Sequence, residues 1–308
     1  MTLESSIIEE PVIQEQRFAS IRERMAGESG VVMLIGPRGT GKTTLGRLLI
    51  DDALEAGMRC AMVDADIARS SIGPPACVGM RIIDSPGAFG GRNGADALRF
   101  VGSTSPNGVV LPHVVGATAL IDEARPDADF IVLDTTSVVA GVVGQTLKYH
   151  LAELAKPTIV IALQRGNEMD PIIGMLRRFL SARVAVLQPE SDALPAGPVE
   201  AAQELAAAFR AELEAPLPRW RVQSTVFAPT LPDGFELGPL DGMIVGIQDA
   251  RGACLGLGVL DHDGDTLRVA TRHGDAMSGL RLGSLKIDLE TFATTRIRLR
   301  EFFFGLKK

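Results

Sequence analysis

The chain has 308 residues, of which 46% are apolar and 22% are charged, and its formal net charge is −7. This length accommodates one large core and a smaller domain, and the composition is that of a folded α/β protein rather than a disordered chain. The acidic balance argues against a broad basic surface for duplex nucleic acid but leaves room for a local groove. Arginines gather in two places, at Arg165, Arg177, Arg178 and Arg183, and at Arg296, Arg298 and Arg300. Each group could be a solvated face of the protein or a track that binds phosphates.

Targeting signals and metal-binding spacings are absent from the sequence. No apolar run reaches about 18 residues, and the segment after Met1 lacks a charged and then apolar signal peptide. We therefore expect a cytoplasmic protein with no membrane span. Cys60, Cys77 and Cys254 are odd in number and scattered, so we expect small buried side chains and neither disulfides nor a metal cluster.

The predicted elements alternate between strand and helix over most of the chain. Residues 1–28 are predicted as an N-terminal helix and lead-in, and residues 29–215 as one domain. Buried apolar runs predict strands at Val31–Ile35, Cys60–Val63, Phe130–Leu133, Thr158–Leu163 and Arg183–Leu187. Helical patterns occur at Thr43–Ala56, Val114–Glu123, Gly144–Leu154, Pro171–Leu180 and Glu200–Glu214. The alternation predicts a doubly wound, mostly parallel sheet that binds ligands at the carboxyl ends of its strands.

The pattern changes to a period of two in residues 220–308. Prolines punctuate an extended link before it, at Pro216, Pro218, Pro229 and Pro232. Strands are predicted at Gly242–Gln248, Ala253–Leu260, Thr266–Ala270 and Leu282–Leu289, with Asp-Gly turns among them. This segment is therefore predicted to be a small all-β C-terminal domain.

The first predicted strand enters a glycine-rich turn that opens a helix. The turn matches the phosphate-binding pattern GxxxxGK[ST] and consists of Gly36, Pro37, Arg38, Gly39, Thr40, Gly41, Lys42 and Thr43, followed by Thr44. Glycines let backbone N–H groups curl around a phosphate, and the helix N-terminus adds positive charge. Lys42 is expected to reach the β- and γ-phosphates, and the Thr43 hydroxyl to bind Mg²⁺. The sequence predicts a P-loop that binds a nucleoside triphosphate.

Carboxylates follow two of the predicted strands. Asp64 and Asp66 end the second strand, and Asp134 ends the strand Phe130–Leu133. A carboxylate at such a place can hold Mg²⁺ or accept a proton from an attacking hydroxyl. The same residues could instead cap a helix or a turn.

Two further segments carry polar groups. Asp84 begins the sequence Asp-Ser-Pro-Gly, which fits a GTPase phosphate sensor, but no Asn-Lys-x-Asp guanine motif occurs in the chain, and we interpret Asp84 as a turn residue. The loop Gly102–Gly108 includes Ser105 and Asn107. Its hydroxyls and amides could contact the sugar-phosphate of a substrate.

Taken in order, these segments resemble one family. The motifs are GPRGTGKTTL, VDADIARSSIGPP, FVGSTSPNG, FIVLDTTSVVAGVVGQTLK and KPTIVIALQR, and GMIVGIQDARGACLGLGVL and GLRLGSLKID follow near the C-terminus. They resemble the polynucleotide 5′-hydroxyl kinases related to the pre-mRNA cleavage-factor kinase and the kinases of ribosomal-RNA processing. The resemblance runs from about residue 28 to residue 290 and lacks the N-terminal β-domain of the eukaryotic members.

The resemblance implies transfer of a phosphoryl group from ATP, with Mg²⁺, to the 5′-hydroxyl end of single-stranded RNA or DNA. It implies that Asp66 is the general base or a metal-side acid and that Thr135 and Thr136 form a clasp over the phosphates. Ser105 and Asn107 would line the substrate side.

The chain departs from the family in the lid helix, which usually carries several arginines. Residues 197–213 keep only Arg210. Because arginines neutralise the charge of the transferring phosphoryl group, we expect Arg177, Arg178 or Arg69 to replace them. Two alternatives stay open: a catalytically weak ATP-binding scaffold for RNA processing, and a regulatory GTPase.

Overall fold

A computed structural model describes residues 18–89, 94–189, 197–214, 216–228, 230–231, 237–264 and 266–298. The chain forms two compact units. The first contains Met1–Asp64, Met80–Gly91 and Ile121–Pro195, and the second contains Ala65–Gly79, Arg92–Leu120 and Ala196–Lys308. The boundaries predicted from the sequence, at residues 28, 29–215 and 220–308, stay predictions.

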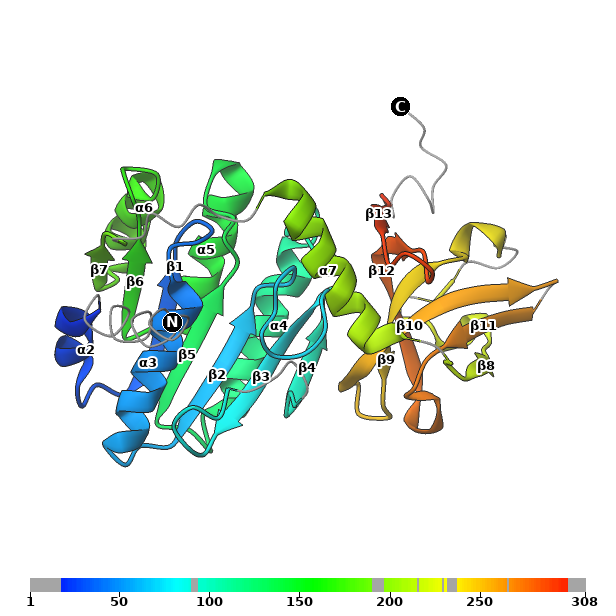
Figure 1. Cartoon of the computed structure of the whole chain (residues 1–308), viewed down its shortest axis with the longest axis horizontal. Helices are drawn as coiled ribbons and strands as arrows, with labels where there is room; N and C mark the ends of the chain where they lie inside the picture. Colours follow the sequence, from blue (N-terminus) through cyan, green and yellow to red (C-terminus); the bar gives the residue numbers. More distant parts are fainter. Residues whose placement is uncertain are drawn as a thin grey trace, which may run out of the picture. The chain divides into compact units, whose positions relative to one another are not determined.

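A seven-stranded sheet has the strand order β4-β3-β2-β5-β1-β6-β7. The strands are β1 (Gly30–Ile35), β2 (Cys60–Ala65), β3 (Cys77–Ile83), β4 (Ala97–Phe100), β5 (Phe130–Thr135), β6 (Ile159–Leu163) and β7 (Val184–Leu187). β1 pairs in parallel with β5 and β6, and β6 with β7, so their arrows point to one edge in Figure 1. The prediction of an α/β fold with a mostly parallel sheet is confirmed.

The central strands are apolar because both of their faces are covered. All six residues of β5 are buried, and so are the five of β6. Strands buried on both faces have continuous apolar runs rather than alternating ones, which is why the sequence pattern located them well. The helices are α2 (Ala19–Met25), α3 (Lys42–Glu55), α4 (Val110–Ala124), α5 (Gly141–Ala155), α6 (Asp170–Leu180) and α7 (Pro198–Leu213).

The second unit contains a six-stranded antiparallel sheet of order β13-β12-β9-β10-β11-β8. Its strands are β8 (Arg219–Arg221), β9 (Met243–Gln248), β10 (Cys254–Asp263), β11 (Thr266–Ala270), β12 (Gly279–Ile287) and β13 (Thr294–Arg296). Short 3₁₀ turns are η1 (Ser224–Val226), η2 (Gly238–Leu240) and η3 (Gly274–Ala276). A Cβ on Gly246 would lie 2.4 Å from Cγ of Phe100, so β9 packs closely on that ring only because it has a glycine there. The predicted β-rich C-terminal part is confirmed.

Some elements were not predicted from the sequence. β3, β4 and β8 are short or carry charged residues, and their patterns are too weak to identify them. The helix predicted within residues 1–28 is observed as α2, and its residues before Phe18 lie outside the described part of the chain. Cys60, Cys77 and Cys254 are buried and free, as predicted.

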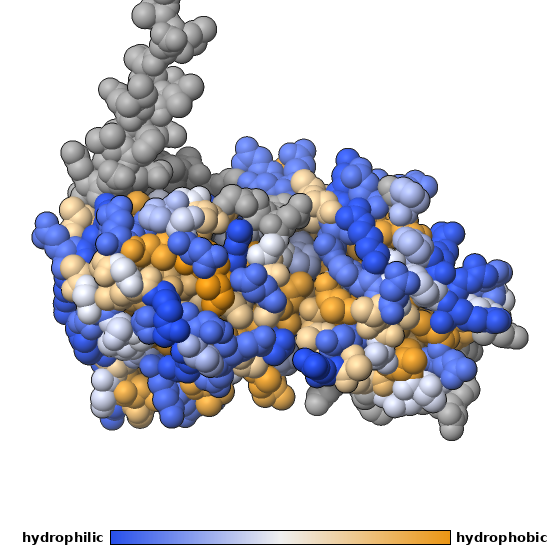
Figure 2. Space-filling view, turned by 90° about the horizontal axis from the view of Figure 1, so that it is seen from below, coloured by the Kyte–Doolittle hydropathy of each residue, from blue (hydrophilic) through white to orange (hydrophobic). Residues whose placement is uncertain are grey.

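The molecular surface is mixed in polarity. The face drawn in Figure 2 carries hydrophilic residues, in blue, around smaller hydrophobic areas, in orange. Within the described residues, no helix combines the length and the apolar character that a membrane span requires.

Candidate functional site

The turn between β1 and α3 has the backbone that the glycine pattern predicted. Gly39 and Gly41 have φ angles of 72° and 86°, in the left-handed region that favours glycine. A Cβ on Gly36 would lie 2.5 Å from the carbonyl oxygen of Leu163 in β6, and one on Gly41 would lie 3.2 Å from Cζ of Phe18. The three glycines therefore allow a tight turn packed against β6 and the residue before α2.

Lys42 lies inside the curl of this turn. Its side chain is buried, and Nζ donates hydrogen bonds to the carbonyl oxygens of Gly36 at 2.8 Å and Pro37 at 2.9 Å. The Thr40 hydroxyl also donates to Pro37, at 2.9 Å. Because Lys42 is the first residue of α3, the loop combines an ammonium group with a helix N-terminus. This arrangement is suited to binding phosphate.

Thr43 and Asp134 meet at the carboxyl edge of the sheet. The Thr43 hydroxyl donates to Oδ2 of Asp134 at 2.5 Å, and the carboxylate is 2% exposed. Hydroxyl and carboxylate oxygens are the donors that Mg²⁺ prefers. The described residues contain no cluster of three or more acidic, histidine or cysteine side chains that could hold a metal, so phosphate oxygens and water would complete the coordination. The residues present fit a metal ion bound together with a nucleotide.

Thr135 and Thr136 belong to a buried polar network next to this pair. Lys148 of α5 is fully buried, and its Nζ donates to Oγ1 of Thr135 at 2.7 Å and to the carbonyl oxygen of Thr136 at 2.6 Å. The Thr135 hydroxyl in turn donates to the carbonyl oxygen of Leu34 at 2.7 Å. The network therefore ties the end of β5 to the end of β1, immediately before the phosphate loop. Sequence reasoning missed Lys148, although a lysine in an apolar helical pattern was a signal for it.

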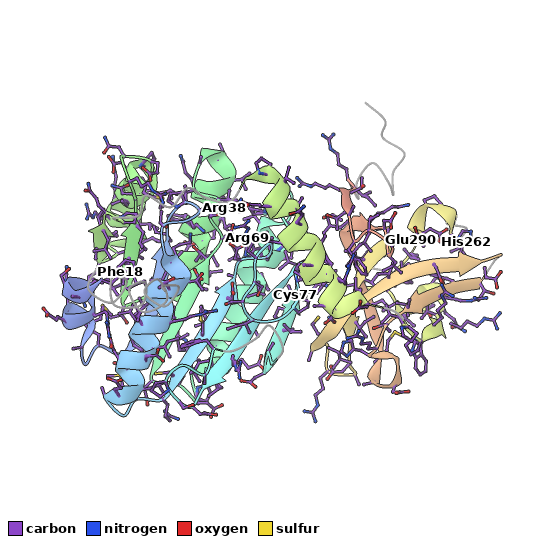
Figure 3. The ribbon with its side chains drawn as sticks, in the orientation of Figure 1. Phe18, Arg38, Arg69, Cys77, His262 and Glu290 are labelled. Carbon is purple, nitrogen blue, oxygen red and sulfur yellow. The ribbon has the colours of Figure 1, made fainter. Side chains whose placement is uncertain are left out.

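Arg165 contacts the phosphate loop and was also missed as a site residue. It follows β6 by two residues, and its Nη2 donates to the carbonyl oxygen of Gly39 at 2.7 Å. Its Nη1 lies 3.5 Å from the carbonyl oxygen of Arg38, which Figure 3 labels on the loop after β1. Its position just past the carboxyl end of a central strand was the available signal.

Glu168 fixes the segment that carries Arg165. Its carboxylate accepts the N–H groups of Arg165 and Gly166, both at 2.8 Å. Partial burial alone would raise the pKa of Glu168, but these N–H groups, its own N–H and the charge of Arg165 outweigh the effect of burial, so the pKa is lowered. The carboxylate therefore stays ionised and keeps the segment in place at neutral pH.

Asp64 and Asp66 differ in their surroundings. Asp64 lies in β2 and is 1% exposed, in the first unit. Asp66, in the second unit, accepts the N–H groups of Ala68 and Arg69 with Oδ1, both at 3.1 Å. The capping arrangement considered for Asp66 from the sequence is therefore present. The ring nitrogen Nε2 of His113, buried in α4, lies 2.8 Å from the carbonyl oxygen of Ala65 and so fixes the backbone just before Asp66.

The loop that contains Ser105 and Asn107 lies in the second unit. Ser103 Oγ donates to the Ser105 carbonyl oxygen at 2.8 Å, and the Asn107 carbonyl oxygen accepts a hydrogen bond from Arg296 of β13. Asn107 is exposed and Ser105 is half-buried. The loop thus combines exposed polar groups with an arginine.

The arginines expected to replace those of the lid helix are not at the phosphate loop. Arg177 and Arg178 lie in the last turn of α6, and Nη2 of Arg177 donates to the carbonyl oxygen of Val184 at 3.1 Å. Val184 begins β7, so these arginines lie toward the amino edge of the parallel strands, whereas the phosphate loop lies at the carboxyl edge. The catalytic role expected for Arg177 and Arg178 is therefore not supported by their position.

The two remaining arginines near the lid helix have other partners. Arg210 of α7 lies with its guanidinium carbon 5.0 Å from the centre of the Phe292 ring. Arg69 pairs with Glu204 of α7 at 2.7 Å, and Figure 3 shows it on the loop beside that helix. Both contacts hold α7 within the second unit.

The Asp-Ser-Pro-Gly turn does not face the phosphate loop. The N–H of Gly87 donates to the Asp51 carboxylate at 2.9 Å, and Asp51 lies nine residues past Lys42 in α3, about 14 Å along the helix. Asp84 itself is exposed. This placement supports the interpretation of Asp84 as a turn residue and disfavours a GTPase sensor.

Known proteins are similar to this chain in sequence and in fold. Residues 36–203 match the family described as the P-loop of the mRNA cleavage and polyadenylation factor CLP1, which is more than half of the chain. The polyribonucleotide 5′-hydroxyl-kinase of Pyrococcus abyssi is 37% identical over 142 residues, which cover 46% of this chain and 40% of the relative. The kinase of the same name from Methanocaldococcus jannaschii is 35% identical over 144 residues, covering 46% and 39%. The chain thus spans less than half the length of these relatives.

Similarity over a longer stretch is weaker. The polyribonucleotide 5′-hydroxyl-kinase Clp1 of Xenopus tropicalis is 25% identical over 293 residues, which cover 90% of this chain and 62% of that protein. Two solved structures of Clp1p with Pcf11p have TM-scores of 0.63 and 0.60 at 16% identity, each covering 90% of this chain and 79% of the other. They share the fold. From the family match, the chain belongs to the CLP1 P-loop family of the mRNA cleavage and polyadenylation factor.

Proposed function

We propose that the protein is an ATP-dependent kinase that phosphorylates the 5′-hydroxyl end of a polynucleotide. The observation that carries the proposal is the phosphate loop with buried Lys42 and the Thr43–Asp134 pair, in a chain similar to archaeal polyribonucleotide 5′-hydroxyl-kinases. Phosphoryl transfer needs positioning and charge stabilisation more than covalent chemistry from the protein. The described groups supply both.

Each residue has a separate task in this proposal. The loop N–H groups and Lys42 bind the phosphates of ATP, and Thr43 and Asp134 bind the Mg²⁺ that neutralises phosphate charge when it is bound. Asp66 accepts the proton of the attacking 5′-hydroxyl through its carboxylate. Thr135 and Thr136, in the buried network with Lys148, support the end of β5 next to Asp134, and Ser105 and Asn107 contact the substrate strand.

Label transfer tests the proposal. The protein is incubated with γ-labelled ATP, Mg²⁺ and oligonucleotides ending in a 5′-hydroxyl, with RNA and DNA of one sequence in separate reactions. Oligonucleotides that already carry a 5′-phosphate are the control. Label on the 5′-hydroxyl ends alone is the expected result, and the ratio of the RNA and DNA rates gives the preference. Absence of label on both would exclude the kinase.

A second candidate is an ATP-binding scaffold with little turnover. It is favoured by the contacts of α7, the helix at the place of the family's lid. Arg210, the arginine among the described residues of α7, lies over the Phe292 ring, and Arg69 pairs with Glu204 of the same helix. The same experiment separates the two: a protein that binds ATP and transfers no label to any 5′-hydroxyl end is the scaffold.

A further inference from the structure

The contacts of Arg165 reveal a role that neither the family pattern nor the sequence motifs assign. Its guanidinium lies on the phosphate loop, bonded to the Gly39 carbonyl oxygen at 2.7 Å and near that of Arg38 at 3.5 Å. Both residues belong to the first unit, as does the whole loop. The contact therefore joins the end of β6 to the turn after β1.

The contact between Arg165 and the two carbonyl groups also sets the direction of the neighbouring N–H groups, because the peptide bond is planar. In a trans peptide the C=O and the following N–H point in opposite directions. When the Arg38 and Gly39 carbonyl groups face the guanidinium outside the loop, the N–H groups of Gly39 and Thr40 must face the other way, into the curl that contains Lys42. Within the described residues the Gly39 N–H donates to no other backbone group, and the turn at Arg38 and Gly39 brings the Thr40 N–H toward the Pro37 carbonyl oxygen, which faces Lys42 inside the curl.

Arg165 adds to the few contacts that fix this part of the loop, where buried Thr40 closes the turn by donating to Pro37. Gly39 is exposed and has no side chain, and its φ of 72° is one of several that glycine adopts readily. The Thr40 hydroxyl bonds to Pro37 and not to the next peptide. A guanidinium offers several donors in a rigid plane, so it can orient two successive peptides at once.

Arg165 is itself held from the other side. Glu168 accepts the N–H groups of Arg165 and Gly166, and Gln164 accepts the N–H of Met169 at 3.1 Å. The backbone of Arg165 is thereby anchored to the start of α6, while its exposed side chain reaches across to the loop.

We propose that Arg165 is a positioning residue that aims the N–H groups of Gly39 and Thr40 at the phosphates of the nucleotide. This deepens the proposed function, since it concerns the same nucleotide site, and it predicts the ligand group: a phosphate that ADP and ATP share. Arg165 thus supports the loop from outside.

Nucleotide affinity tests the role without relying on transfer. Binding of ADP and of ATP is measured by calorimetry for the wild type, Arg165→Met, Arg165→Lys and the control Arg183→Met. Arg183 is an exposed arginine that pairs with Glu28 at 3.1 Å, in the same unit and away from the loop. Arg165→Met is expected to lower the affinity for ADP and for ATP about three- to tenfold each, which is the effect of losing one exposed charged hydrogen bond. Arg165→Lys, which keeps one donor, recovers part of the loss, and Arg183→Met binds as the wild type.

Further measurements separate the possible outcomes. The melting temperature of Arg165→Met stays within about 2 °C of the wild type, because the side chain is exposed. Unchanged affinity for both nucleotides overturns the inference, and so does a loss confined to ATP, which would make Arg165 a γ-phosphate ligand. A wild type that binds neither nucleotide overturns it as well. If the wild type binds nucleotide and transfers no label while Arg165→Met still loses affinity, the kinase proposal fails and the role of Arg165 stands.

Discussion

Single residues decide the chemistry of the phosphate loop. Lys42 is buried, and its ammonium bonds to the backbone carbonyl oxygens of Gly36 and Pro37, which it can exchange for phosphate oxygens. Hydrogen bonds between charged groups are about twice as strong as neutral ones. Affinity for the triphosphate therefore depends heavily on this side chain.

Lys42→Ala removes that ammonium. We expect ATP binding to weaken by at least tenfold and label transfer to fall by orders of magnitude, because the charge on the β- and γ-phosphates is no longer balanced. Calorimetry with ATP and the transfer reaction measure the two effects. If Lys42→Ala binds ATP and transfers label as the wild type does, the segment is not a functional P-loop.

Asp66→Asn tests the general base. The amide keeps an oxygen that can accept the N–H groups of Ala68 and Arg69, so the turn should survive. ATP affinity is expected to stay near that of the wild type, while transfer falls about 10²–10⁴-fold because the amide accepts no proton. A fully active variant would move the role to Asp64 or Asp134, and an unfolded one would leave Asp66 a purely structural cap.

The site residues that the sequence predicted are those that belong to one contiguous motif. Gly36 to Thr43 are contiguous, and their pattern fixes both conformation and ligand. Arg165 and Lys148 could not be located in the same way. Arg165 acts on Gly39, 126 residues away in sequence, and such a contact exists only once the strands have assembled. Lys148 acts on Thr136, 12 residues away, once α5 packs against the end of β5.

Elements of secondary structure position these residues, and α5 is the clearest example. It carries Lys148 into the interior behind the end of β5, where the ammonium bonds to Thr135 and Thr136. A buried polar network of this kind rigidifies the backbone that it joins, and it is costly to break. The helix therefore braces the strand end on which Asp134 lies.

Lys148→Met replaces the buried ammonium with an apolar side chain of similar length. The hydroxyl of Thr135 and the carbonyl oxygen of Thr136 lose a donor, so we expect the free energy of unfolding to fall by about 1–3 kcal/mol. The Mg²⁺ concentration for half-maximal transfer should also rise. Denaturant unfolding and a Mg²⁺ titration measure the two effects. Lys156→Met, at the exposed end of the same helix, is the control and should change neither.

Substitutions in the last turn of α6, unlike Lys148→Met, are expected to change little. Arg177 bonds to Val184 at the beginning of β7, and Arg178 lies beside Phe179. Arg177→Ala and Arg178→Ala are therefore expected to keep label transfer within about twofold of the wild type, since exposed side chains away from a site contribute little. A loss of 10²-fold in either variant would restore the compensating role that the sequence suggested.

The sequence located the elements with long apolar patterns and missed the short ones. β5 and β6 have continuous buried runs and were predicted within about two residues. β3 contains Gly79 and Arg81 within its seven residues, and β4 has only four residues. Their pairing depends on neighbouring strands, which a local pattern cannot report.

At the scale of the whole molecule, the antiparallel sheet contributes more than stability to its unit. Arg296 of β13 donates a hydrogen bond to the carbonyl oxygen of Asn107, so this sheet supports the loop Gly102–Gly108. A guanidinium beside exposed polar groups is suited to the backbone of a single strand. The sheet is thereby linked to the expected substrate contacts.

Arg296→Ala should weaken binding of the polynucleotide and leave binding of ATP unchanged. We expect KM for a 5′-hydroxyl oligonucleotide to rise several-fold, with KM for ATP unchanged, and the dependence of log affinity on log salt to decrease by about 1. Steady-state kinetics at several salt concentrations measure both effects. Arg221→Ala, in β8 of the same sheet, is the control. Equal KM values for Arg296→Ala and the wild type would contradict this link.

The strand order β2-β5-β1-β6 also governs when the site can form during synthesis. The phosphate loop is complete at Thr43, but Asp134, Lys148 and Arg165 emerge from the ribosome some 90 to 120 residues later. At about 5–20 residues per second, that delay lasts several seconds. A nascent chain that ends before β5 therefore carries the whole motif without the strand and side chains that support it, so we expect nucleotide to stabilise chains that extend beyond residue 165 more than shorter ones.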